Sequence, residues 1–217
     1  VDFSSLPALP PPHDRSPGAD AQIEDLRIAL LGNTLIQRAA DFGFLETELS
    51  RRAPGARVVF RNLGWPGDTV TGDARVEFGP GEENRSGWER PAGDAQGYGF
   101  LKLLSHLRRE EPHILFVAYG SNVAFEGQAG LAKFEAGLAQ LLDTVMPTGV
   151  HVVLMSPPPR DTHATSFGDF AEQNKSLANV AAHLEEVAKA RSCSYVDLFT
   201  HWPRDKTAYT DNGIHLN

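Results

Sequence analysis

The sequence predicts an α/β fold in which a five-stranded parallel sheet lies between two layers of helices. The chain has 217 residues, which is long enough for one domain with its own core. Five short apolar runs recur along it, and helical periodicity fills the intervals between them. Apolar strands that alternate with helices form a parallel sheet covered on both faces. These observations together predict a three-layer α/β/α sandwich.

The first elements lie in the N-terminal third of the chain. The apolar run RIALL at 27–31 predicts a buried strand, which ends at Gly32. Apolar residues at helical spacing then predict a helix over 35–52, and Gly55 stops it. The run RVVFRNL at 57–63 predicts the second strand.

The rest of the chain continues this alternation. Three further strands are predicted at 113–119, 151–156 and 195–199. Three further long helices are predicted at about 97–110, 129–146 and 170–192. Because crossovers between parallel strands are right-handed, this order predicts a doubly wound sheet of the flavodoxin-like kind.

Two segments differ from this pattern. Residues 1–22 are rich in proline and show little periodicity, which predicts an N-terminal arm or linker before a domain over 23–217. The segment 79–99 is polar and rich in glycine. It is long for a connection inside a compact domain, which predicts a functional or mobile loop.

Composition excludes several classes of function. The net charge of −8 argues against a nucleic-acid partner or an anionic membrane surface, since both require a basic footprint. No run approaches 18 apolar residues, so no membrane span is predicted. The single cysteine, Cys193, excludes an internal disulfide framework and a cysteine-based zinc cluster. No metal-ligand spacing or phosphate-binding glycine motif is present, so we expect no metal and no cofactor.

The residues that follow the predicted strands indicate a site. Ligands of doubly wound sheets bind beyond the carboxyl ends of the strands. The segments at this edge are Gly32-Asn33-Thr34, Gly64-Trp65-Pro66-Gly67-Asp68-Thr69, Gly120-Ser121-Asn122, Ser156-Pro157-Pro158-Pro159 and Asp211-Asn212-Gly213-Ile214-His215. Small residues, hydroxyls, an amide side chain and a histidine therefore converge at one edge of the sheet.

Four of these segments, in this order, resemble the sequence blocks of the SGNH/GDSL hydrolase superfamily. LLGNTL resembles its first block, NLGWPGDT the second, YGSN the third and DNGIH the last. The resemblance covers about residues 27–217. It implies a three-layer α/β fold and the chemistry of esterases, lipases and carbohydrate deacetylases.

The resemblance also implies a role for each matching residue. Thr34 would supply the nucleophilic hydroxyl, and His215 would be the base that takes its proton. The donors to the oxyanion would be the backbone N–H of Thr34, the N–H of Gly67 and the side-chain amide of Asn122. At Gly67 the absence of a Cβ would allow close approach of the substrate.

The sequence departs from the family pattern at the residues that matter most for catalysis. Thr34 stands where the family has serine, and its extra methyl group restricts the side chain and crowds attack on a carbonyl. The family's acid, three residues before the histidine, is Asn212 here, with Asp211 one residue further away. Asp211, Asn212 or a backbone carbonyl would then orient His215. Asn33 replaces the aspartate of the first block.

Simpler interpretations exist for several of these residues. Asn33 and Thr34 are good N-cap residues for a helix that starts near Leu35. Asp68 and Thr69 are predicted to cap a helix over 70–78. Ser121 is a poor candidate nucleophile, because the G-x-S-x-G context of a nucleophile elbow is absent.

We therefore expect an SGNH-type ester hydrolase whose substrate is a small-molecule or carbohydrate ester, such as an O-acyl carbohydrate. The alternative is a catalytically impaired module of the same fold that binds a glycan or a partner domain. A third hypothesis, a flavodoxin-like ligand-binding domain, predicts a copurifying flavin or nucleotide.

The N-terminal half also resembles a branch of the superfamily found in large multidomain bacterial proteins, which implies that the chain is part of a larger protein. A start at Val1 and the lack of the family's usual helix after His215 are expected of a trimmed chain. The expected location is extracytoplasmic, either periplasmic or secreted.

Overall fold

The apolar runs form one five-stranded sheet, in which every pair of neighbouring strands is parallel. The strands are β1 (Leu26–Gly32), β2 (Val58–Gly64), β3 (Ile114–Ala118), β4 (His151–Met155) and β5 (Ser194–Val196). Their order across the sheet, β2-β1-β3-β4-β5, is the flavodoxin-like order that the sequence predicts. The computed structural model describes residues 25–77, 95–161, 169–203, 209–210 and 212–215. The predicted arm at 1–22 and most of the segment 79–99 lie outside these ranges.

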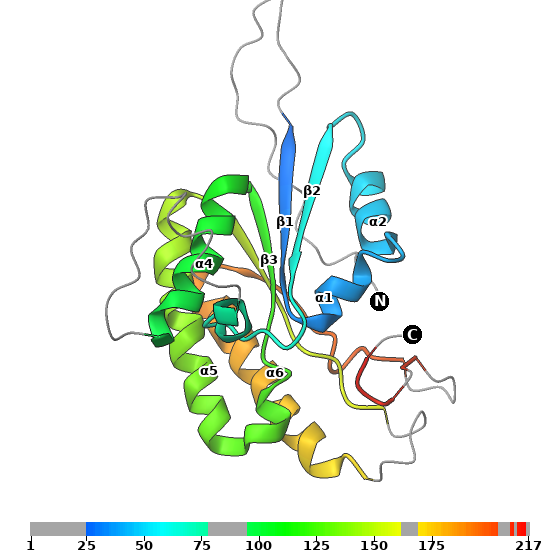
Figure 1. Ribbon diagram of the computed structural model, residues 1–217. Helices are drawn as coiled ribbons and strands as arrows, with labels where there is room; N and C mark the ends of the chain where they lie inside the picture. Colours follow the sequence, from blue (N-terminus) through cyan, green and yellow to red (C-terminus); the bar gives the residue numbers. More distant parts are fainter. Residues whose placement is uncertain (1–24, 78–94, 162–168, 204–208, 211, 216–217) are drawn as a thin grey trace, which may run out of the picture.

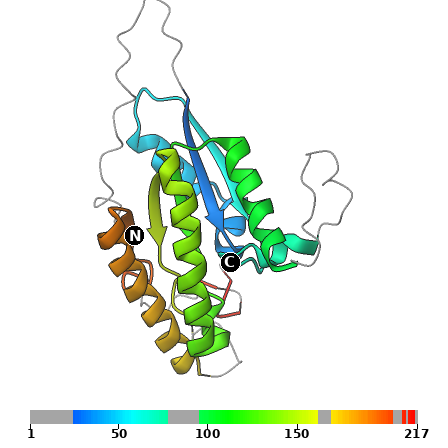
Figure 2. The same ribbon diagram turned by 90° about the vertical axis from the view of Figure 1, so that its left-hand side faces the viewer.

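Helices cover both faces of the sheet, so the predicted three-layer architecture is confirmed (Figure 1). One face carries α1 (Thr34–Ala39) and α2 (Phe44–Arg52). The other face carries α4 (Ala95–Glu110), α5 (Val123–Val145) and α6 (Ala171–Arg191). On that face α5 and α6 pack side by side (Figure 2). Two 3₁₀ helices, η2 (Asp73–Glu77) and η3 (Met146–Thr148), complete the described elements.

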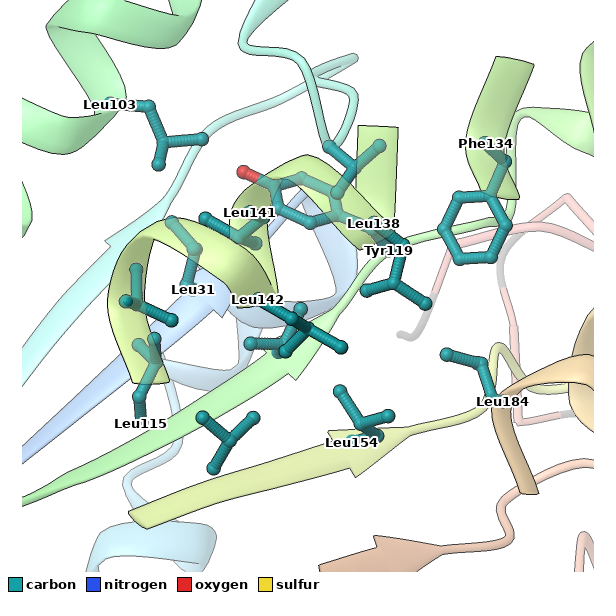
Figure 3. Packing of buried hydrophobic residues seen from close by; sticks show 14 of the residues in the cluster. Leu31, Leu103, Leu115, Tyr119, Phe134, Leu138, Leu141, Leu142, Leu154 and Leu184 are labelled. Atoms are coloured by element: carbon teal, nitrogen blue, oxygen red, sulfur yellow. The ribbon is translucent and has the colours of Figure 1, made fainter. Parts of the chain in front are cut away.

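The core consists of two clusters because side chains of a strand alternate between its faces. In β1, Ala29 and Leu31 belong to the cluster on the face of α4, α5 and α6, whereas Ile28 and Leu30 belong to the cluster on the face of α1 and α2. The strands are buried on both faces, which explains why they appear as continuous apolar runs in the sequence. Figure 3 shows the larger cluster, where Leu138, Leu141 and Leu142 of α5 lie over the strands.

Two predicted helices differ from the observed ones at glycines with positive φ. The predicted helix 35–52 is two helices, because Gly43 adopts φ 64° and is the non-helical N-cap of α2. Phe42 and Phe44 stack beside this break with ring centroids 5.9 Å apart. The predicted helix 129–146 starts earlier, at Val123, and a non-helical Gly127 (φ 59°) interrupts its first turns. Apolar periodicity continues across Gly43 and for this reason did not locate that break, whereas Gly127 lies before the start of the predicted helix.

Candidate active site

A pocket of about 300 Å³ lies at the carboxyl edge of the sheet, where the sequence predicts the site. Thr34, Gly67, Asn122 and His215 all line it. The first three follow β1, β2 and β3, and His215 lies in the C-terminal segment, so the four residues are far apart in the sequence. The structure therefore brings together the four residues to which the resemblance assigns a nucleophile, a base and two oxyanion donors.

Asn33 links the ends of β1 and β3 and places Thr34. Its Oδ1 accepts a hydrogen bond from the backbone N–H of Leu35 (3.3 Å), so Asn33 is the N-cap of α1 as predicted. Its Nδ2 donates to Ser121 Oγ (2.6 Å). Thr34 is the first residue of α1 rather than its cap, and a hydroxyl at this position borders the pocket.

Gly67 lies in a turn that only glycine adopts without strain. Its φ is 72°, in the left-handed region that L side chains rarely occupy. A Cβ added at Gly67 would meet no atom within 4 Å, so the surrounding protein does not crowd the position. The requirement for glycine here is therefore conformational. The absence of a Cβ keeps this part of the pocket open.

The side chain of Asn122 is held with its amide nitrogen away from Ser121. Ser121 Oγ donates a long hydrogen bond to Asn122 Oδ1 (3.4 Å). Asn122 Nδ2 lies 3.5 Å from the carbonyl oxygen of Gly67, which leaves its second hydrogen for another acceptor. Asn122 precedes α5 but makes no side-chain capping bond to it. This orientation suits a donor to an oxygen atom in the pocket.

Asn212 contacts the ring of His215, and its amide orientation is fixed by the backbone. Asn212 Oδ1 accepts hydrogen bonds from the N–H groups of Ile214 (3.0 Å) and His215 (2.9 Å). Its Nδ2 must therefore face His215 Nδ1, 3.1 Å away. Because an amide nitrogen only donates, Nδ1 is the acceptor, and the proton of the neutral ring resides on Nε2. Asp211, the other predicted orienting residue, lies outside the described residues.

Asp161, which follows β4, anchors the segment that carries His215. Its backbone N–H donates to Gly213 O (2.9 Å). Its Oδ2 accepts from the N–H of Tyr209 (3.3 Å) and from Thr210 Oγ1 (3.4 Å). Thr210 Oγ1 in turn accepts from the N–H of Gly213 (2.9 Å). Sequence reasoning missed this role, because these contacts join residues about 50 positions apart.

A buried ion pair holds the loop that contains Gly67. Arg75 Nε donates to Asp68 Oδ2 at 2.7 Å, and their side chains are 1% and 0% exposed. Tyr119 OH donates to the same oxygen (2.7 Å), while Arg75 Nη2 donates to Leu63 O (2.8 Å). Burial, followed by the charge of Asp68, raises the pKa of Tyr119 well above its ordinary value.

The predicted cap at Asp68 is therefore wrong, because its carboxylate is committed to Arg75. The helix predicted over 70–78 is the 3₁₀ helix η2. Thr69, the other predicted cap residue, accepts from the N–H of Asp73 through its hydroxyl (3.3 Å).

His106 extends this network and makes stability depend on pH. Its Nδ1 lies 3.2 Å from Arg75 Nη1, which only donates, so Nδ1 must be an unprotonated acceptor. Burial, followed by the charge of Arg75, lowers the pKa of His106 below its ordinary value of 6.5.

We expect the free energy of unfolding to decrease as the pH falls below about 6.5, because the unfolded chain then binds a proton at His106 that the folded chain does not. His106→Gln, which cannot titrate, should make this decrease shallower between pH 6.5 and 5. Urea denaturation of both proteins across this range measures the two slopes. Equal slopes would contradict the prediction.

Two residues of the pocket wall had not been singled out from the sequence. Phe125, in the first turn of α5, is 66% exposed and borders the pocket. Arg160 borders it too, with its guanidinium carbon 5.0 Å from the centre of the Phe125 ring. Arg160 directly follows the Ser156–Pro159 run that the sequence places at this edge. This position in the sequence could have indicated that Arg160 lies at the pocket.

The chain has the three-layer α/β/α architecture of a class of hydrolases, with a pocket at the carboxyl edge of its parallel sheet. More specifically, the chain belongs to the GDSL-like lipase/acylhydrolase family, which it matches over residues 36–217. The match begins two residues after Thr34. The resemblance seen in the sequence is thereby confirmed. No curated protein sequence matches the chain.

Solved structures share the fold at low sequence identity. An acetylxylan esterase of Geobacillus stearothermophilus, Axe2, solved as a catalytic mutant, has a TM-score of 0.61 at 13% identity, with 88% of this chain and 86% of that chain covered. An acylhydrolase-like protein of Bacteroides fragilis has a TM-score of 0.58 at 14% identity, with 88% and 78% covered. BT4096, a gut microbial diltiazem-metabolizing enzyme, has a TM-score of 0.57 at 15% identity, with 90% of this chain covered. The match spans only 44% of that enzyme's length.

No helix in the described ranges is long and apolar enough to cross a bilayer. Within the same ranges, no group of three or more histidine, cysteine, aspartate or glutamate side chains could hold a metal ion.

Proposed function

We propose that the chain is an ester hydrolase that acts on an O-acyl carbohydrate, with Thr34 as nucleophile and His215 as base. The observation that carries the proposal is that Thr34, Gly67, Asn122 and His215 line one pocket. Membership of the acylhydrolase family supports the reaction type.

In the proposed mechanism His215 first shifts to the tautomer with its proton on Nδ1, and its Nε2 then takes the proton of the Thr34 hydroxyl as that hydroxyl attacks the ester carbonyl. The N–H groups of Thr34 and Gly67 and the Nδ2 of Asn122 donate to the oxyanion of the tetrahedral intermediate. His215 then protonates the departing alcohol, and the acyl group remains on Thr34. A water molecule, deprotonated by His215, releases the acyl group as a carboxylic acid and restores the hydroxyl.

Two observations support a carbohydrate as the alcohol part of the substrate. The exposed face of Phe125 at the pocket suits the apolar face of a sugar ring. An acetylxylan esterase is among the proteins that share the fold.

The orientation of Asn212 favours a second candidate, a catalytically impaired module that binds a glycan or a partner domain. A base must present an unprotonated Nε2, but the amide of Asn212 favours the ring with its proton on Nε2. In this candidate His215 donates a hydrogen bond to the ligand instead of accepting a proton.

Hydrolysis of p-nitrophenyl acetate and of an acetylated xylan distinguishes the two candidates. For an esterase, we expect slow turnover by the wild type, loss of turnover in Thr34→Ala and in His215→Ala, and a strong increase in Thr34→Ser, which lacks the crowding methyl group. Turnover by the folded wild type that does not exceed that of both alanine variants would overturn the esterase proposal. Glycan binding to the same protein would then support the second candidate.

A further inference from the structure

Arg160 is a buried cation without a carboxylate partner among the described residues. The residue as a whole is 7% exposed. Nη2 donates to the backbone oxygen of Ser121 (3.1 Å), whereas Nε is buried and has no hydrogen-bond acceptor. Burial lowers the pKa of Arg160 to about 10, because the uncompensated charge is costly in a desolvated position.

Arg75 provides an internal comparison. It is also buried, but its guanidinium pairs with Asp68 and donates to two further oxygen atoms, of Leu63 and Tyr119. A buried arginine is ordinarily compensated in this way. The guanidinium of Arg160 instead lies over the face of Phe125, 5.0 Å from the ring centre, and an aromatic face attracts a cation weakly. The compensation that Arg75 has from Asp68 is therefore missing at Arg160 in the described structure.

The position of Arg160 indicates what would supply that compensation. Ser121 and Phe125, which flank its guanidinium, line the same pocket as Thr34 and His215. The backbone of Arg160 is fixed by Asn174, whose Oδ1 accepts from its N–H (2.6 Å) and whose Nδ2 donates to its carbonyl oxygen (3.1 Å). The cation is thus held in the wall of the pocket.

We propose that Arg160 forms an anion-binding subsite of this pocket and selects a substrate that carries a carboxylate, namely the O-acylated form of a sugar acid. Phe125 stacks on the sugar ring, and the guanidinium attracts the carboxylate of the same ring. Glu126 also lines the pocket, but it is exposed to solvent, which screens its repulsion of an anion. The inference rests on the proposed function for the acyl transfer, but not for the binding of the acid.

Matched substrates test the subsite. An O-acetylated methyl galacturonoside and its uronamide have the same ring and acetyl group, and only the first carries a charge. We expect the wild type to prefer the acid in kcat/KM, and Arg160→Gln to lose about 10–100-fold on the acid while changing little on the amide. Arg160→Lys, which keeps the charge, should retain part of the preference. Arg61→Gln, which removes an exposed ion pair between Arg61 of β2 and Glu110 of α4, is the matched control and should behave as wild type.

Binding separates this proposal from the proposed function. Calorimetric titration with methyl galacturonoside, which has no ester to cleave, should show binding to the wild type and 10–100-fold weaker binding to Arg160→Gln. If this holds and no ester is hydrolysed, the subsite stands and the esterase proposal falls. Equal losses of kcat/KM on the acid and on the amide would show that Arg160 only supports the structure, and would overturn the subsite. Absence of binding and of any preference for the acid would also overturn it.

Discussion

Replacing Asn212 with aspartate is expected to raise kcat for ester hydrolysis by about 10²–10⁴-fold, because the carboxylate reverses the polarity of the hydrogen bond to His215. In the present chain Asn212 Oδ1 is held by the N–H groups of Ile214 and His215, and Nδ2 faces the ring. An aspartate would keep both backbone bonds through one oxygen. Its second oxygen would accept a hydrogen bond from the N–H of His215 Nδ1, which leaves Nε2 unprotonated and able to take the proton of Thr34.

Two further measurements decide whether the increase has this cause. In the double variant with Thr34→Ala the gain must vanish, since the nucleophile would be gone. Nitrogen-15 NMR of histidine should find the His215 proton on Nε2 in the wild type and on Nδ1 in Asn212→Asp. A wild-type ring with its proton already on Nδ1, or an Asn212→Asp variant with unchanged kcat, would contradict the prediction.

Arg75→Met should lower the free energy of unfolding by about 3–5 kcal/mol, because it leaves the carboxylate of Asp68 buried without its cation. Both side chains are at most 1% exposed. Asp68 Oδ1 already lacks a hydrogen-bond partner, and Arg75→Met would leave the neutral hydroxyl of Tyr119 at Oδ2 in place of a cation. For a chain of this size the loss corresponds to a fall in Tm of roughly 6–20 °C. Urea denaturation followed by circular dichroism measures it.

Arg61→Met is the matched control for Arg75→Met. Arg61 and Glu110 also pair at 2.7 Å, but their side chains are 52% and 24% exposed. Solvent screens such a pair, so its loss should cost no more than about 1 kcal/mol. The double variant Asp68→Leu with Arg75→Met should recover much of the stability lost in Arg75→Met, since no charge remains buried. Similar losses for the Arg61 and Arg75 single variants would show that burial of the Asp68–Arg75 pair has no special effect.

Much of the fold could be predicted because it depends on periodicity along the chain. Apolar runs such as 113–119 indicated strands buried on both faces, and the structure places β3 at Ile114–Ala118. The helix break at Gly43 was not predicted, because apolar spacing continues through it while the backbone changes its conformation. The candidate residues could be placed at one edge because parallel strands all end on the same side of a sheet.

By itself, the sequence determined the fold class, the strand order and the positions of Thr34, Gly67, Asn122 and His215 at the carboxyl edge of the sheet. Only the tertiary structure decided the partners of polar side chains. Asp68 pairs with Arg75 and Tyr119 instead of capping a helix, and Arg160 reaches Ser121. Strand and helix patterns repeat over a few residues and can be read locally. The partner of a buried charge depends on which distant segments pack around it, and no local pattern encodes that.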